Sequence, residues 1–98
     1  MGQNQVVLEG ILTEKDVLRY TPAGIPHLEF RLQHQSRQLE AGGERDVTVS
    51  MSAVALGEPA LKGAKLETGQ TVVVKGFLSQ RSLKSEYPVL HVNQIKSL

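Results

Sequence analysis

The three histidines offer the most versatile chemistry in this sequence, since imidazole binds metal ions and transfers protons near neutral pH. His27 and His34 lie in one extended segment and His91 in another, far along the chain. Because side chains alternate along a strand, the odd spacing of His27 and His34 sends them to opposite faces. The sequence therefore predicts no metal site and no cofactor, and the histidines are interpreted as hydrogen-bonded polar groups.

Two acidic pairs, Glu14 with Asp16 and Glu44 with Asp46, have the spacing that places both carboxylates on one side of an extended segment. General acid–base catalysis needs a carboxyl group in an apolar environment that raises its pKa. Each pair instead encloses a basic residue in a polar part of the sequence. We interpret both pairs as solvated charge, and we predict no catalytic residues and no enzymatic activity.

The composition is typical of a globular domain. The chain has 98 residues, of which 40% are hydrophobic and 21% charged, and its formal net charge is +1. This length suits one domain, residues 1–98. The absence of cysteine excludes disulfides and thiolate metal sites. With no apolar run near the roughly 20 residues of a membrane span and no signal segment at its start, the protein is expected to be cytoplasmic.

Charge is distributed unevenly along the chain. Residues 1–50 contain five basic and seven acidic side chains, whereas residues 51–98 contain six basic and three acidic ones. A strongly basic nucleic-acid clamp is not indicated, because net charge far from zero is what marks such proteins. The second half of the chain is nevertheless compatible with a small basic surface.

Alternation of apolar and polar residues, the pattern of half-buried strands, recurs in five segments. In the second segment Leu28, Phe30 and Leu32 are predicted to face inward, and in the last segment Leu90 and Val92. The five predicted strands span residues 6–12, 27–34, 46–53, 70–79 and 89–95.

The connecting segments complete the predicted architecture. Residues 36–44 end in Ala-Gly-Gly and are expected to form a mobile hairpin tip. Residues 54–66 contain proline and glycine and are predicted to hold one or two helical turns. A helical segment between strands 3 and 4 gives the element order of an all-β, five-stranded OB-fold barrel. Gly10 and Gly76 favour this barrel, whose strands bend sharply, over the alternative of a generic antiparallel sandwich.

An OB-fold barrel offers a surface for single-stranded nucleic acid on its second and third strands and in the flanking loops. Basic and polar residues are predicted to point outward there, but of the four aromatic residues only Tyr20 and Tyr87 are expected to be exposed. Because base stacking contributes ~1–3 kcal/mol per base, we predict a modest affinity carried by phosphate contacts. The candidate contacts are Arg19, Tyr20, Arg31, Gln33, Gln35, Arg37, Arg45, Thr48, Ser50, Arg81 and Lys84.

The first predicted strand is apolar on both faces. Val6 shares one face with Leu8 and Leu12, while Val7 and Ile11 lie on the other. A strand with one face in water alternates apolar with polar residues. We therefore predict a homodimer whose interface includes Val6, Val7 and Ile11; coverage of this strand by the helical segment is the alternative.

Several stretches of the sequence occur together in a recognisable order: Thr-Pro-Ala-Gly-Ile-Pro-His at residues 21–27, Phe-Arg-Leu-Gln-His-Gln-Ser at 30–36, Glu-Ala-Gly at 40–42, Gly-Phe-Leu at 76–78 and Leu-His at 90–91. Through them the chain resembles the PriB family of bacterial primosomal replication proteins over residues 6–95. The resemblance implies an OB-fold homodimer, similar to bacterial single-stranded DNA-binding protein. Such a dimer binds single-stranded DNA, joins the replication-restart helicase PriA at stalled or abandoned forks and helps to recruit a downstream loading factor.

The resemblance also implies which basic residues contact DNA. They are Arg19, Arg45 and Lys84, together with Arg31, Arg37 and Arg81 through their place on the same face. Gly43 and Thr48 stand where some family members have aromatic residues, and Gln35 stands where a basic residue is often found. The last hairpin also has fewer lysines. These departures weaken the DNA site that the resemblance implies.

Two other functions remain open from the sequence. The few aromatic residues and the near-zero net charge favour a protein–protein adaptor whose nucleic-acid binding is weak or vestigial. An RNA-binding module is the other alternative, although no helical extension or basic tail supports it.

Overall fold

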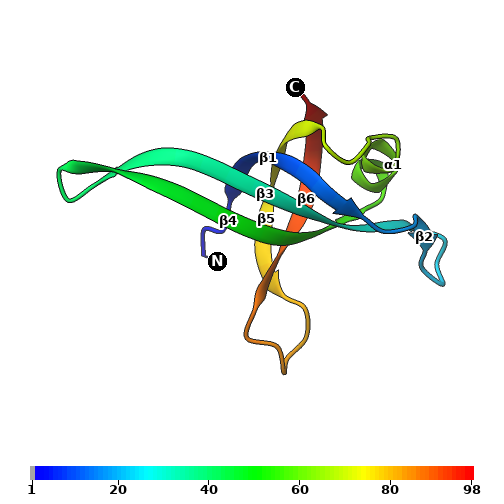
Figure 1. Ribbon diagram of the computed structural model, residues 1–98. Helices are drawn as coiled ribbons and strands as arrows, with labels where there is room; N and C mark the ends of the chain where they lie inside the picture. Colours follow the sequence, from blue (N-terminus) through cyan, green and yellow to red (C-terminus); the bar gives the residue numbers. More distant parts are fainter. Residues whose placement is uncertain (1) are drawn as a thin grey trace.

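The computed structural model describes residues 2–98 as six strands and one short helix (Figure 1). The elements are β1 Val6–Lys15, β2 Arg19–Tyr20, β3 Pro26–Glu40, β4 Gly43–Leu56, α1 Glu58–Ala64, β5 Thr71–Gln80 and β6 Pro88–Ser97. The five predicted strands correspond to β1, β3, β4, β5 and β6. The two-residue strand β2 is too short to show an alternating pattern, and the sequence did not predict it.

Five strands close into a barrel. Hydrogen-bonded neighbours follow the order β1-β5-β6-β4-β3-β2, and a further pairing of β1 with β3 joins the two sides of the sheet. β4 and β6 run parallel, and β2 lies outside the ring on the edge of β3. The fold is therefore mostly β, a five-stranded OB-fold-like closed barrel with one short helix between β4 and β5, as the sequence predicts.

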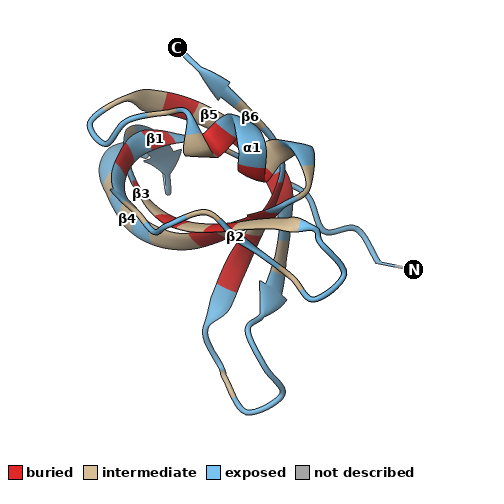
Figure 2. Cartoon of the chain, turned by 90° about the vertical axis from the view of Figure 1, so that its right-hand side faces the viewer, coloured by how far each residue is buried: buried red, intermediate tan, exposed pale blue. Residues whose placement is uncertain are grey.

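Buried residues recur along the five barrel strands (Figure 2), and their apolar side chains form one core cluster. Leu28, Phe30 and Leu32 of β3 and Leu90 and Val92 of β6 are each at most 4% exposed, which confirms their predicted inward positions. Fully burying one such side chain stabilises the fold by ~1.5–3 kcal/mol. This shared interior fixes the strands, and with them the outward side chains that alternate with the buried ones.

Two glycines allow neighbouring strands to approach each other. A Cβ atom at Gly76 would lie 1.7 Å from the backbone oxygen of His91, and one at Gly10 would lie 2.9 Å from that of Gln33. The pairing of β5 with β6 shifts register at Gly76, which indicates a β-bulge. Both glycines therefore permit a close backbone approach, and the irregularity expected of a barrel strand is found at Gly76.

The helix α1 packs against β3, β4 and β6. Pro59 lies in its first turn, where the missing backbone N–H of proline is tolerated. At the other end, Lys15 Nζ donates hydrogen bonds to the carbonyl oxygens of Ala64 and Leu66, which helps to fix the helix C-terminus. No helix within residues 2–98 is long and apolar enough to cross a membrane.

The main departure from the predicted fold lies between β3 and β4. The sequence predicts a connector over residues 36–44, but the strands extend through it up to a two-residue turn. Ala41 and Gly42 have φ angles of 53° and 80°, as the type I′ hairpin turn requires. Residues 34–49 form a two-stranded arm that projects from the barrel (Figure 1). Apolar alternation is weak there because the arm leaves the core.

The two faces of β1 differ in burial. Leu12 is 1% exposed, and Val6 packs against the core, whereas Val7 is 64% exposed and Ile11 45%. Because α1 packs elsewhere, these last two side chains remain uncovered. Of the three predicted dimer-interface residues, Val7 and Ile11 thus lie on the open face, and Val6 points into the barrel.

Candidate nucleic-acid interface

A row of polar side chains follows the outer surface of β3 and β4. Directly opposed residues of an antiparallel pair share a face, and the register opposes Arg31 to Ser52 and Gln35 to Thr48. The residues between them, such as Leu32, face the core. We call this row the polar stripe; its residues are Arg31, Gln33, Gln35 and Arg37 of β3 and Asp46, Thr48, Ser50 and Ser52 of β4.

Arg31 is the best-positioned cation of the polar stripe. Its Nη1 donates a hydrogen bond of 2.8 Å to Ser52 Oγ, and its Nη2 donates one of 3.1 Å to Ser50 Oγ. Both acceptors are neutral, so the guanidinium is held in place while its charge stays available. Because guanidinium groups suit planar, multidentate contacts to phosphate, Arg31 combines position and charge for this role.

The other predicted arginines are all engaged by carboxylates. The ion pairs are Arg37 with Glu44 (3.1 Å) and Asp46 (3.3 Å), Arg81 with Glu29 (2.7 Å), Arg19 with Asp16 (3.7 Å) and Arg45 with Glu40 (2.6 Å). Solvent-exposed pairs typically contribute only ~0–1 kcal/mol. A phosphate can therefore replace the carboxylate, but each of these arginines has a competitor within the chain.

The structure brings only part of the predicted contact set together. Arg19 of β2 is opposed to His27 of β3 in the strand register, on the face of β3 that carries the polar stripe. Arg81 forms its ion pair with Glu29 on the same face. Arg45 is opposed to Gln38 and so lies on the opposite face of the arm. The register thus separates Arg45 from the stripe residues with which the sequence grouped it.

Two predicted contacts lie at the ends of the barrel. Tyr20 follows Arg19 in β2, so its side chain points to the other side of that strand, where it is 61% exposed. Lys84 is exposed in the hairpin between β5 and β6. Among residues 2–98, no carboxylate forms an ion pair with Lys84.

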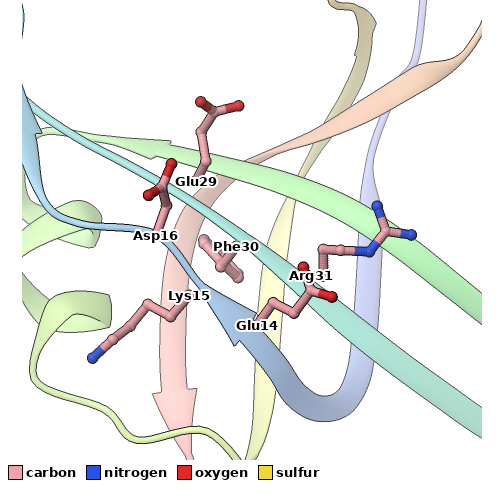
Figure 3. A pocket seen from close by; sticks show the side chains of 6 residues that line it. All are labelled: Glu14, Lys15, Asp16, Glu29, Phe30 and Arg31. Carbon is pink, nitrogen blue, oxygen red and sulfur yellow. The ribbon is translucent and has the colours of Figure 1, made fainter.

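An acidic hollow of about 500 Å³ opens where β1 ends beside β3 (Figure 3). Glu14, Asp16 and Glu29 line it, while Arg31 lies at its margin and Lys15 points away toward α1. Like charges repel, so this hollow disfavours a phosphate backbone. Glu29 shares the outward face of Arg31 by alternation along β3, whereas the proximity of Glu14 and Asp16 to Arg31 depends on the pairing of β1 with β3.

The histidines differ in their surroundings, and hydrogen bonds of the predicted kind are found at His34. His34 contacts the Glu9 backbone oxygen through Nδ1 (2.6 Å) and Ser36 Oγ through Nε2 (2.7 Å). His91 stacks on Phe77, which is 37% exposed although the sequence predicted only the tyrosines to be open to solvent. Within residues 2–98, no three His, Asp or Glu side chains are grouped to hold a metal ion.

Comparison with known proteins places this geometry in a family. The profile of a family described as "another single-strand binding protein family" matches residues 4–94. The replication restart protein PriB of Nitrosomonas europaea is 36% identical over 96 residues, covering 98% of this chain and 89% of the relative. PriB of Neisseria meningitidis serogroup A is 40% identical over 97 residues, covering 98% and 96%.

Solved structures agree with these relatives. The protein priB of Ralstonia solanacearum superposes with a TM-score of 0.88 at 28% identity, covering 99% of this chain and all of that one. The single-stranded DNA-binding protein of Thermus aquaticus has a TM-score of 0.79 at 33% identity, but this chain spans only 50% of its length. The chain therefore belongs to the family of the replication restart protein PriB, a non-enzymatic, OB-fold-like branch of the single-strand binding proteins.

Proposed function

We propose that this protein is a primosome accessory factor of DNA replication restart that binds single-stranded DNA along the polar stripe. The observation that carries this proposal is the continuous row of outward polar side chains on β3 and β4, with Arg31 held by two serines and in no ion pair with a carboxylate of residues 2–98. The stripe contains no aromatic residue. Phosphate contacts and amide hydrogen bonds therefore supply the binding energy, and base stacking on the stripe does not.

The proposed assembly is a homodimer joined through β1. Residues 6–10 pair with β5 along one edge, while β3 pairs with β1 only from Ile11 onward. No strand within residues 2–98 pairs with the second edge of residues 6–10. Apart from the contact of His34 Nδ1 with the Glu9 backbone oxygen, this edge is open to pairing with another chain, and the exposed Val7 would pack against its two-fold mate.

The proposed partners are a PriA-type helicase and a downstream loading factor at stalled forks. This assignment rests on the relatives named replication restart protein PriB and on their match over nearly the whole chain. A pull-down with the purified helicase, repeated without DNA, tests it directly. Capture only in the presence of DNA would contradict a direct partnership.

Titration of labelled oligonucleotides tests the DNA-binding proposal. Three to five phosphate contacts, at ~0.7 per contact, predict that log affinity falls with log salt with a slope of about −2 to −3.5. Replacing Arg31 by alanine should lower the affinity and flatten this slope by about one contact. Lys65, an exposed lysine after α1, provides the control substitution, Lys65→Ala. Helicase binding without salt-sensitive DNA binding would instead favour the adaptor function.

Sedimentation tests the dimer. The chain has a mass of 10.7 kDa, so sedimentation at micromolar concentration should give about twice that mass for the proposed dimer. Val7→Asp should dissociate it, because the charge would be placed at the open edge, and the exposure of Val7 leaves the fold intact. A monomeric native protein would contradict the proposal.

A further inference from the structure

A second hollow lies away from the polar stripe, where the N-terminal end of β1 meets β5 and β6. Its volume of about 480 Å³ lies within the range of small-ligand pockets, ~300–1,000 Å³. Gln5, Lys75, Phe77, Asn93 and Gln94 contribute to its lining. With Asn4, which also lines it, the hollow combines an aromatic ring, a cation and four side-chain amides in one place.

The aromatic ring of this hollow has a fixed orientation. Phe77 and His91 are opposed across β5 and β6, and their rings stack with centroids 5.0 Å apart and planes inclined by 12°. Since Phe77 is still 37% exposed, it offers apolar aromatic surface to a ligand. Nucleobases stack on such surfaces with ~1–3 kcal/mol per base.

A cation lies on the same face, two residues before Phe77. Lys75 is exposed, is opposed to Gln94 on β6 and has no ion pair with any carboxylate of residues 2–98. Its ammonium is therefore available to a phosphate without displacing an internal partner. This contrasts with Arg37, which two carboxylates already hold.

The walls of the hollow are built by specific contacts. Asn4 Nδ2 donates to the Leu78 backbone oxygen (2.7 Å), and the Leu78 N–H donates to Asn4 Oδ1 (3.0 Å). These bonds fasten the segment before β1 across β5. On the opposite side, the register shift leaves Asn93 without an opposed residue on β5. The amides of Gln5 and Asn93 are both exposed and offer donors and acceptors to the edge of a base.

We propose that this hollow binds one nucleotide of the single-stranded DNA, with the base against Phe77 and the phosphate at Lys75. The inference rests on the proposed function and extends it, because the bound strand would pass from the polar stripe onto the β5–β6 face. One cation beside an aromatic ring and several amides suits a nucleotide, whereas an acidic peptide segment would call for several cations. Val7 also lines this hollow, so the nucleotide site lies beside the proposed dimer contact, with Phe77 and Lys75 on the neighbouring strand β5.

Photo-crosslinking tests the site without any substitution. Oligonucleotides that carry 5-iodouracil at successive positions are irradiated with the native protein, and the adducts are located by mass spectrometry. We expect an adduct on Phe77 or His91 for at least one position of a long oligonucleotide. Adducts confined to Tyr20 and Tyr87 would overturn the proposal, because these exposed rings lie outside the hollow.

Two variants provide an independent measurement. Phe77→Leu keeps an apolar side chain but removes the ring, and Lys75→Gln removes the charge. With an oligonucleotide of about 30 nucleotides, well beyond the 4–16 that one OB fold covers, we expect Phe77→Leu to weaken binding about 5- to 10-fold. Lys75→Gln should flatten the salt slope by ~0.7. Lys65→Gln serves as the matched control, and unfolding temperatures verify that each variant is folded.

The outcomes separate this inference from the proposed function. If Arg31→Ala weakens DNA binding while folded Phe77→Leu and Lys75→Gln do not, the hollow is no nucleotide site and the stripe proposal stands. If the native protein binds no single-stranded DNA, both proposals fail. If the two variants weaken binding of an acidic peptide but leave DNA affinity unchanged, the ligand class assigned here is wrong.

Discussion

The arm and the β5–β6 face carry their positive charge in different ways. On the arm, Arg37 and Arg45 are held by neighbouring carboxylates, and residues 1–50 contain more acidic than basic side chains. In residues 51–98 the basic side chains are in excess. The lysines of that half form no ion pair with the described part of the chain; they are Lys62, Lys65, Lys75, Lys84 and Lys96.

This difference shows that the number of arginines on a surface does not measure its readiness for phosphate. Beyond the barrel the arm lacks a core, so cross-strand side-chain pairs, which contribute ~0.2–1 kcal/mol each, help to hold its two strands together. Guanidinium groups suit these pairs because they bind carboxylates through several donors. The β5–β6 face is stabilised by the barrel interior, and its lysines are free of that structural role.

The largest effect is expected from the backbone that supports the two regions. Gly76→Ala should destabilise the protein by more than ~3 kcal/mol, beyond ordinary overpacking, because the new Cβ would collide with the His91 backbone oxygen. Gly43→Ala at the arm should change stability little, since nothing lies within 4 Å of its Cβ position. Thermal unfolding measures both, and similar transition temperatures would refute the close approach at Gly76.

The next effect comes from giving the polar stripe the aromatic ring that it lacks. Thr48 is exposed on the stripe, so Thr48→Trp should strengthen DNA binding by up to ~1–3 kcal/mol if one base stacks there. Gln38→Trp places the same ring on the opposite face of the arm and should change the affinity less. Fluorescence titration compares the two variants. Equal gains would show that the two faces of the arm are equivalent for DNA.

A smaller effect should separate free from engaged cations. Lys84→Ala removes a side chain without an ion pair among residues 2–98, and should weaken binding several-fold and flatten the salt slope by ~0.7. Arg45→Ala removes a cation that Glu40 already holds on the opposite face, so the affinity should fall less than twofold. If Arg45→Ala lowers the affinity more than Lys84→Ala in the same salt series, internal ion pairing does not decide whether a cation is available to phosphate.

The smallest effect is expected when a competitor carboxylate is removed. Asp46→Asn should release Arg37 partly, because Glu44 still pairs with it, and DNA affinity should rise about twofold, in line with the ~0.2–1 kcal/mol of exposed pairs. Glu67→Gln produces the same change of net charge outside the arm. If both variants raise the affinity equally, the gain reflects net charge alone and not release of Arg37.

The sequence alone determined the elements that depend on local pattern. Apolar alternation located the five long strands and inward residues such as Leu28, Phe30 and Leu90. Gly10 and Gly76 stood out because a glycine inside a strand often marks a bulge, a bend or a close backbone approach, and the structure has such an approach at both. The outward position of Thr48 was also predicted correctly, because alternation along a strand gives the face of a residue without knowledge of the neighbouring strand.

Which side chains meet one another was decided only by the tertiary structure. The two-residue turn at Ala41–Gly42 sets the register that opposes Arg37 to Asp46 and sends Arg45 to the other face. A register shift of one residue moves every side chain to the opposite face, and the sequence predicted a connector there. The contact of Arg81 with Glu29 spans 52 positions. Contacts between residues so far apart in the sequence depend on closure of the barrel, which no local sequence pattern encodes.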